Sequence, residues 1–187
     1  MFSQIESITA LTLSGGEPSL VPEKIQEILE SAKRFNVSIG NFYLVTNGMN
    51  VSKEFLHAII DIYVYCDDNE ISGVKLSKDA WHPIVSHENI KALQTFSFFE
   101  LGTYDNRWSR SYLVNEGRAK KLGARKEVRV FNPYIKEWRQ VEGNLYLNCK
   151  GNVIKSCDLS YRSQDKPANI LCRACDNLRD FIMVQTI

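Results

Sequence analysis

Short apolar runs and longer amphipathic segments take turns along the first two thirds of the chain. The short runs are typical of buried strands, whereas the longer segments repeat their apolar residues at helical spacing. The predicted strands are residues 7–13, 41–45, 71–76, 96–101 and 127–131. The predicted helices are residues 21–35, 87–95, 109–122 and one that begins after Ser52. This alternation predicts an α/β fold with a mainly parallel sheet of about five β/α units.

Two of these helices have clear starts and clear apolar faces. Pro22 suits a first helical turn, where its missing amide costs nothing, and the Ser52 hydroxyl can cap the next helix. The residues at helical spacing are Ile25, Ile28, Leu29 and Ala32 in the first helix, and Phe55, Ala58, Ile59 and Ile62 in the second. We expect both faces to be buried. Periodicity leaves open whether residues 63–66 extend the second helix.

After Pro133 the pattern changes, because apolar residues become sparse. Residues 145–147 and 153–155 flank a Gly151-Asn152 pair, which predicts a hairpin. The remainder is polar and irregular until a short helix predicted at residues 177–184. We therefore divide the chain into an α/β domain at residues 1–132 and a small tail at residues 133–187.

Composition narrows the classes of function. The 187 residues carry a net charge of +1, so no overall attraction to nucleic acid or to membranes is expected. We find no signal peptide and no apolar run of membrane-spanning length, which predicts a cytoplasmic protein. One basic and aromatic stretch suits a local contact with RNA, DNA or an acidic protein, although most such faces are simply solvated. Its main residues are Arg107, Trp108, Arg110, Lys120, Lys121 and Arg125.

The tail holds four of the five cysteines, Cys149, Cys157, Cys172 and Cys175. The last two form a CxxC pair, which brings two sulfurs to one edge of a tetrahedron. Four thiolates around one metal would supply the folding free energy that so sparse a core lacks. Zinc and iron–sulfur clusters both accept four cysteines, so the metal stays open. The alternative is that these are incidental thiols, and for the isolated Cys66 we expect a buried structural role.

Polar residues follow three of the predicted strands. Gly15, Gly16 and Glu17 come after the first, Thr46 and Asn47 after the second, and Ser77 after the third. The carboxyl ends of parallel strands meet at one edge of a sheet, where α/β folds bind ligands. Paired glycines let backbone amides approach a ligand, and a glutamate accepts from an ammonium. The alternative is that the glycines form tight turns and that Glu17 is an acid at a helix N-terminus.

The run Gly15-Gly16-Glu17-Pro18 resembles the GGEP motif of the radical S-adenosylmethionine (SAM) superfamily, which binds the methionine amino group of SAM. The resemblance implies a partial (β/α) barrel. It also implies SAM contacts by Gly15, Gly16, Glu17, Thr46, Asn47 and Ser77. In that family an upstream CxxxCxxC loop holds the iron–sulfur cluster that cleaves SAM. No cysteine precedes the motif here, so we expect an N-terminally truncated scaffold without that loop.

The cysteine spacing of the tail resembles the SPASM or twitch-type extensions of radical SAM enzymes, which hold auxiliary iron–sulfur clusters, and related tails hold zinc. Residues 40–48, 67–70 and 77–82 look like radical SAM proteins carried by phages and mobile elements. These resemblances imply a catalytically inactive binding protein, such as a phage-encoded inhibitor of a host nuclease or defence complex, in an anti-CRISPR-type role. The alternative is a SAM-binding fragment of an active radical SAM enzyme whose iron–sulfur loop lies in a segment upstream.

Overall fold

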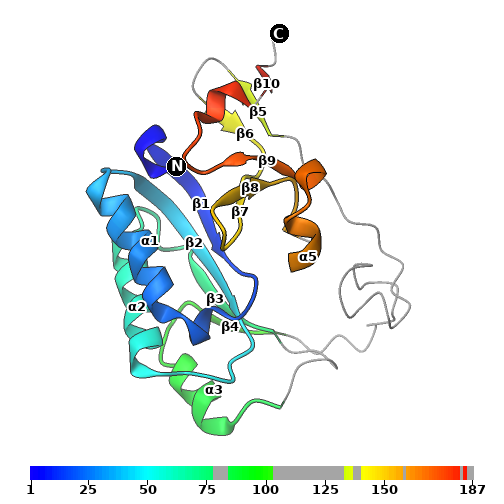
Figure 1. Cartoon of the computed structure of the whole chain (residues 1–187). Coiled ribbons are helices and arrows are strands. Elements are labelled where there is room, and N and C mark those ends of the chain that lie inside the picture. The colour runs from blue at the N-terminus through cyan, green and yellow to red at the C-terminus, as the bar shows by residue number, and fades with distance from the viewer. Residues whose placement is uncertain (78–83, 103–132, 137–139, 158, 182, 185–187) are drawn as a thin grey trace. The chain divides into compact units, whose positions relative to one another are not determined.

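A computed structural model describes residues 1–77, 84–102, 133–136, 140–157, 159–181 and 183–184 of the chain (Figure 1). The chain divides into two compact units. The N-terminal unit is Phe2–Asn106, and the C-terminal unit is Arg107–Ile187 together with Met1. Each unit has its own sheets and its own cluster of buried apolar residues. No helix in the described part of the chain is long and apolar enough to cross a membrane.

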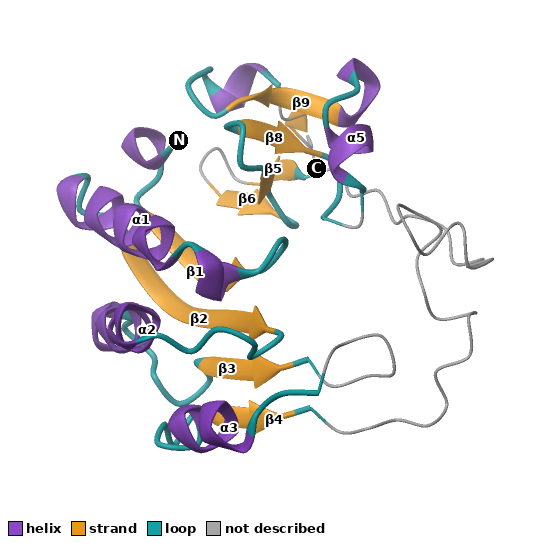
Figure 2. Cartoon of the chain, turned by 60° about the horizontal axis from the view of Figure 1, so that its bottom comes forward, coloured by secondary structure: helices purple, strands orange, loops and turns teal. Residues whose placement is uncertain are grey.

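The described residues of the N-terminal unit form a four-stranded parallel sheet with the strand order β1-β2-β3-β4. The strands are β1 (Ser7–Leu13), β2 (Ser38–Thr46), β3 (Gly73–Leu76) and β4 (Phe99–Leu101). The helices between them are α1 (Pro22–Arg34), α2 (Lys53–Tyr65) and α3 (His87–Leu93). Right-handed crossovers between successive neighbouring strands place helices on one face, and Figure 2 shows α1 and α2 on the same side of the sheet.

This sheet confirms the predicted α/β fold and its parallel pairing. Four of the about five predicted β/α units begin with a described strand. The helix predicted at residues 109–122 and the strand predicted at residues 127–131 lie outside the described residues. Closure of the sheet into a barrel therefore stays a prediction.

The core of the N-terminal unit lies between the sheet and its helices. The buried helix residues are Ile25, Leu29 and Ala32 of α1, and Phe55, Ala58, Ile59 and Ile62 of α2. They confirm the two predicted faces, and Ile28 packs partly buried beside them. From the sheet, Phe42 meets the rings of Tyr63 and Phe98 edge to face, with ring centroids 6.5 and 6.1 Å away. Such pairs add specific geometry to apolar burial.

The start and end of α2 follow from its flanking residues. The Ser52 hydroxyl accepts from the Phe55 amide at 3.1 Å, which confirms the predicted cap. The helix continues through Tyr65, and Cys66 is its C-terminal cap residue. Residues 63–65 thus belong to the helix, where Tyr63 packs against the core.

The described residues of the C-terminal unit form two three-stranded sheets. One joins β7 (Tyr146–Leu147), β8 (Asn152–Ile154) and β9 (Ile170–Arg173) in antiparallel pairs. The other has the order β10-β5-β6, with β5 at Tyr134–Lys136, β6 at Gln140–Glu142 and β10 at Met183–Val184. The predicted hairpin is confirmed by β7 and β8, and Gly151 in its turn has the left-handed φ of 75°. Short helical segments in the described part of this unit lie at Tyr161–Gln164 (α5), at Pro167–Asn169 (η4) and at Leu178–Asp180 (η5).

The short helix predicted at residues 177–184 is wrong. Leu178–Asp180 forms only a 3-10 turn (η5), and Met183–Val184 is the strand β10, which pairs with β5 in parallel. The partner strand β5 lies about fifty residues earlier in the chain. For a short apolar run, pairing with such a distant strand determines the secondary structure more than the propensity of the run itself does. Local periodicity contains no information on distant pairing.

Candidate functional site

The carboxyl ends of β1, β2 and β3 lie side by side at one edge of the sheet. Leu13 pairs with Leu44, Thr46 pairs with Leu76, and the Ser77 amide donates to the Thr46 carbonyl at 2.8 Å. We call this edge, with the residues that follow the strands, the polar edge. Its members are Gly15, Gly16, Glu17, Thr46, Asn47 and Ser77. The structure therefore places all six predicted ligand residues at the same edge, as the sequence predicted.

Glu17 lies at the centre of the polar edge, and its carboxylate connects the ends of β1 and β2. Its Oε1 accepts from the Thr46 hydroxyl at 2.5 Å and from the Ser19 amide at 3.2 Å. Its Oε2 accepts from the Asn47 amide at 2.7 Å. Glu17 is also the cap of the short 3-10 helix η2 (Pro18–Leu20), which agrees with the structural role that its position allowed.

The described hydrogen-bond partners of the Glu17 carboxylate are all neutral dipoles. Its hydrogen-bond donors among the described residues are a hydroxyl and two backbone amides, which are neutral. Among the described residues, no lysine, arginine or histidine forms an ion pair with this half-buried carboxylate. A carboxylate that is ordered and partly shielded from water, but lacks a cation, is a favourable partner for an ammonium group.

Gly15 and Gly16 shape the exposed loop that leads to Glu17. Both have left-handed backbone conformations, with φ of 85° and 59°. A Cβ on Gly15 would meet nothing within 4 Å. Glycine is therefore favoured here by the left-handed backbone conformation and not by a close contact. The amides of the two glycines have no hydrogen bond to any residue that the structure describes. They are therefore open to a ligand.

Three residues that the sequence analysis missed support this site. Ser19 is fully buried, donates its amide to Glu17 and has an Oγ with no partner among the described residues. Its carbonyl accepts from the Asn50 side chain at 2.8 Å. The Asn89 side chain, from α3, donates to the carbonyls of Gly48 and Met49. Ser19 directly follows the GGEP run, which could have drawn attention to it, but no local pattern marks Asn50 or Asn89.

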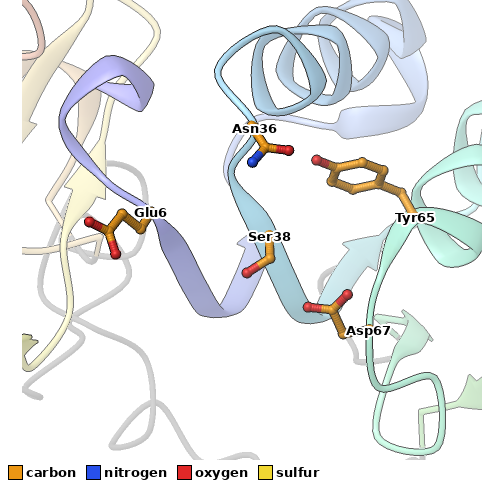
Figure 3. Close-up of a pocket in the computed structure, with 5 residues that line it drawn as sticks. All are labelled: Glu6, Asn36, Ser38, Tyr65 and Asp67. Atoms are coloured by element: carbon orange, nitrogen blue, oxygen red, sulfur yellow. The ribbon is translucent and has the colours of Figure 1, made fainter.

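A hollow of about 570 Å³ lies at the opposite, amino-terminal end of the sheet (Figure 3). It is lined by Glu6, Asn36, Ser38, Tyr65 and Asp67. In Figure 3 the Asn36 amide faces the Tyr65 hydroxyl, while Glu6 lies on the far side of Ser38. One lining residue also has a structural role: the Tyr65 hydroxyl donates to the Val37 carbonyl at 2.8 Å, which connects the end of α2 to the start of β2. Parallel α/β sheets bind ligands beyond their carboxyl ends, so we place the candidate site at the polar edge.

The tail cysteines lie in different surroundings. Cys172, in β9, is buried against Val153 and Leu178, and this burial raises the pKa of its thiol. Cys149, Cys157 and Cys175 are exposed. The hairpin turn and the CxxC turn do touch, because the Ala174 amide donates to the Gly151 carbonyl at 2.8 Å. However, no three His, Cys, Asp or Glu side chains within the described ranges are grouped to hold a metal. The four-cysteine centre therefore stays a prediction.

The basic and aromatic stretch, which suits a local contact with RNA, DNA or an acidic protein, lies outside the described residues. These residues are Arg107, Trp108, Arg110, Lys120, Lys121 and Arg125.

Comparisons of the chain with protein-family models, with curated proteins and with solved structures found no match.

Proposed function

We propose that this chain is a catalytically inactive binding protein of the radical SAM type, and that its polar edge holds the methionine end of SAM. The observation that carries the proposal is the Glu17 carboxylate, which three neutral donors hold in place and no described cation neutralises. The ammonium group of the ligand would supply the missing charge. The open amides of Gly15 and Gly16 suit the carboxylate of the same ligand.

The distribution of cysteines supports binding without radical cleavage. Cleavage of SAM in this superfamily requires an iron with an open coordination position beside the methionine group. In this chain Cys66 caps the end of α2, near the start of β2, because the neighbouring Asp67 amide donates to the Ile39 carbonyl. That is the end of the sheet opposite Glu17. The tail cysteines suit a closed four-ligand centre, of zinc or of an iron–sulfur cluster, which is also part of the proposal.

Calorimetric titration of the whole chain with SAM tests the ligand. We expect the wild type to bind, and Glu17→Ala to weaken binding by about 10- to 100-fold, the usual effect of losing a charged hydrogen bond. Glu23→Ala, an exposed acid in the first turn of α1, is the matched control and should bind like the wild type. Because Glu17 is also a cap, unfolding curves must show that each variant is folded. A wild-type chain that does not bind SAM would refute this part of the proposal.

Anaerobic reconstitution with iron and sulfide, followed by an assay for 5'-deoxyadenosine, tests the absence of catalysis. We expect SAM to remain uncleaved by this chain. Formation of 5'-deoxyadenosine would instead favour an enzyme. If SAM binds and is cleaved only after an upstream segment is added, the chain is the SAM-binding fragment of an active enzyme.

We also propose a protein partner, because β1 is a terminal strand of the sheet that the described residues form. The strand order of the described residues ends at β1, where Thr9, Ala10 and Thr12 are exposed. A terminal strand with free backbone groups can pair with a strand of another chain. A host nuclease or defence complex is the partner class that the resemblance implies. A stoichiometric complex from host lysate that Thr9→Lys abolishes, and the exposed control Thr95→Lys does not, supports this proposal. A chain that stays monomeric and binds only SAM contradicts it.

A further inference from the structure

We infer that Asn89, on α3, is a positioning residue for the polar edge: it holds the loop that brings the Asn47 amide to Glu17. The inference rests on the proposed function, because that function gives Glu17 its ligand. It adds a residue about forty positions away in the chain, on an element that contributes no member of the polar edge itself.

The loop after β2 is attached from two sides. The Asn89 Nδ2 donates to the Gly48 carbonyl at 2.9 Å and to the Met49 carbonyl at 3.2 Å. On the other side, the Asn50 side chain donates to the Ser19 carbonyl at 2.8 Å, which ties the loop to η2. Both contacts engage backbone groups, so they fix the path of the main chain rather than the position of one side chain.

The first three amides of the loop each have a specific acceptor. The Asn47 amide donates to Glu17, the Gly48 amide to the Thr46 hydroxyl at 3.0 Å, and the Met49 amide to the Asn47 side chain at 2.9 Å. The Thr46 hydroxyl in turn donates to Glu17. A shift of the loop carbonyls that Asn89 holds would therefore move two of the donors that order the Glu17 carboxylate.

Close packing and an unusual backbone conformation at Gly48 restrict the main-chain path of the loop. Gly48 is buried and has a φ of 69°, and a Cβ on it would lie 2.5 Å from Leu76 Cδ1. The main chain is thus packed directly against the side chain at the end of β3. Asn89 is suited to this place because one amide nitrogen offers two donors, and two neighbouring carbonyls receive both. Alanine offers no donor, and aspartate would direct a negative charge at the two carbonyls.

The experiment compares Asn89→Ala and Asn89→Asp with Lys91→Ala, an exposed residue of the same helix, in the full-length chain. Hydrogen exchange of the Asn47, Gly48 and Met49 amides reports the loop, and titration with SAM reports the site. We expect both Asn89 variants to raise exchange of these amides about tenfold and to weaken SAM binding about three- to tenfold, with Lys91→Ala unchanged. Global unfolding curves separate a local effect from general loss of stability.

Each outcome bears on the inference. Faster exchange confined to the loop together with weaker SAM binding supports it. Loop exchange equal to that of the wild type overturns it, as does faster loop exchange with unchanged SAM affinity. Faster exchange spread over all of α3 shows a role in the helix alone and also overturns it. If the wild type does not bind SAM, the proposed function fails, and loop exchange by itself then decides whether Asn89 holds the loop.

Discussion

At the scale of single residues, the structural role of Glu17 and the ligand-binding role that we propose for it rest on the same hydrogen bonds. Glu17 caps η2 and joins the ends of two strands, which are contributions to the fold. The same hydrogen bonds orient its carboxylate, so a ligand would find the charge already in place and would lose little entropy in ordering it. Effects of Glu17 substitutions on binding therefore have meaning only beside measurements of stability.

Gly48 offers the sharpest test of packing at a single residue. Gly48→Ala would place a Cβ 2.5 Å from Leu76 Cδ1 and keep a left-handed φ of 69°. We expect a loss of about 2–4 kcal/mol in the free energy of unfolding, the sum of conformational strain and overpacking. Gly15→Ala is the matched control, since its φ is 85° but its Cβ would meet nothing within 4 Å, and it should lose only about 1 kcal/mol. Equal losses in urea unfolding would contradict this account.

The buried thiol of Cys66 should make the free energy of unfolding depend on pH. Burial raises the pKa of this thiol from its ordinary value of 9.0 to about 11. Because the folded pKa is the higher one, the contribution to stability is complete at pH values below 9.0 and disappears as the pH rises through about 11. We expect the wild type to lose about 2–3 kcal/mol more than Cys66→Ala between those limits. Parallel urea-unfolding free energies of the two proteins across this range would disprove the shift.

At the scale of elements, α2 depends on its cap. The Ser52 hydroxyl accepts from the Phe55 amide, an orphan donor of the first turn. Ser52→Ala should therefore lower the free energy of unfolding by about 1 kcal/mol. Ser31→Ala is the control, because the exposed Ser31 hydroxyl bonds the Glu27 carbonyl within α1, where alanine is the better helix former. Loss of stability in Ser31→Ala alone would contradict this assignment.

The elements also show which parts of the fold a local pattern can predict. The faces of α1 and α2 follow from periodicity and the cap at Ser52 from its residue type, because both helices bury their apolar sides against the same sheet. The strand at residues 7–13 is present as predicted, but its expected burial is wrong: β1 ends the described sheet, and of its residues only Leu13 is buried. The gathering of Glu17, Thr46 and Ser77 followed from the geometry of parallel strands. Pairing of β10 with β5, and the contact of Asn89 with the loop after β2, join distant segments. No local pattern contains such contacts.

At the scale of the whole molecule, the described parts of the two units differ in the size of their clusters of buried apolar residues. The N-terminal unit has a continuous cluster of buried apolar residues from every strand except β4 and from all three helices. In the described part of the C-terminal unit, the buried members of the cluster are Val153, Cys172 and Leu178. Small units with so little core commonly need a metal or another cross-link to fold stably. From this difference in buried clusters, we predict that bound metal affects the stability of the C-terminal unit and not that of the N-terminal unit.

We therefore expect bound metal to stabilise the C-terminal unit selectively. Binding to the folded state at about a thousandfold excess over the dissociation constant would add about 4 kcal/mol. Hydrogen exchange of β8 and β9, followed after chelation and after zinc addition or anaerobic iron–sulfide reconstitution, should change, while exchange of β1 and β2 should not. Cys175→Ser, in the CxxC turn, should abolish the response, and Cys66→Ser, far from it in sequence, should retain it. Metal-independent protection of β8 and β9 in the wild type would show that the four tail cysteines are not ligands, and elemental analysis of the purified chain would identify the metal where they are.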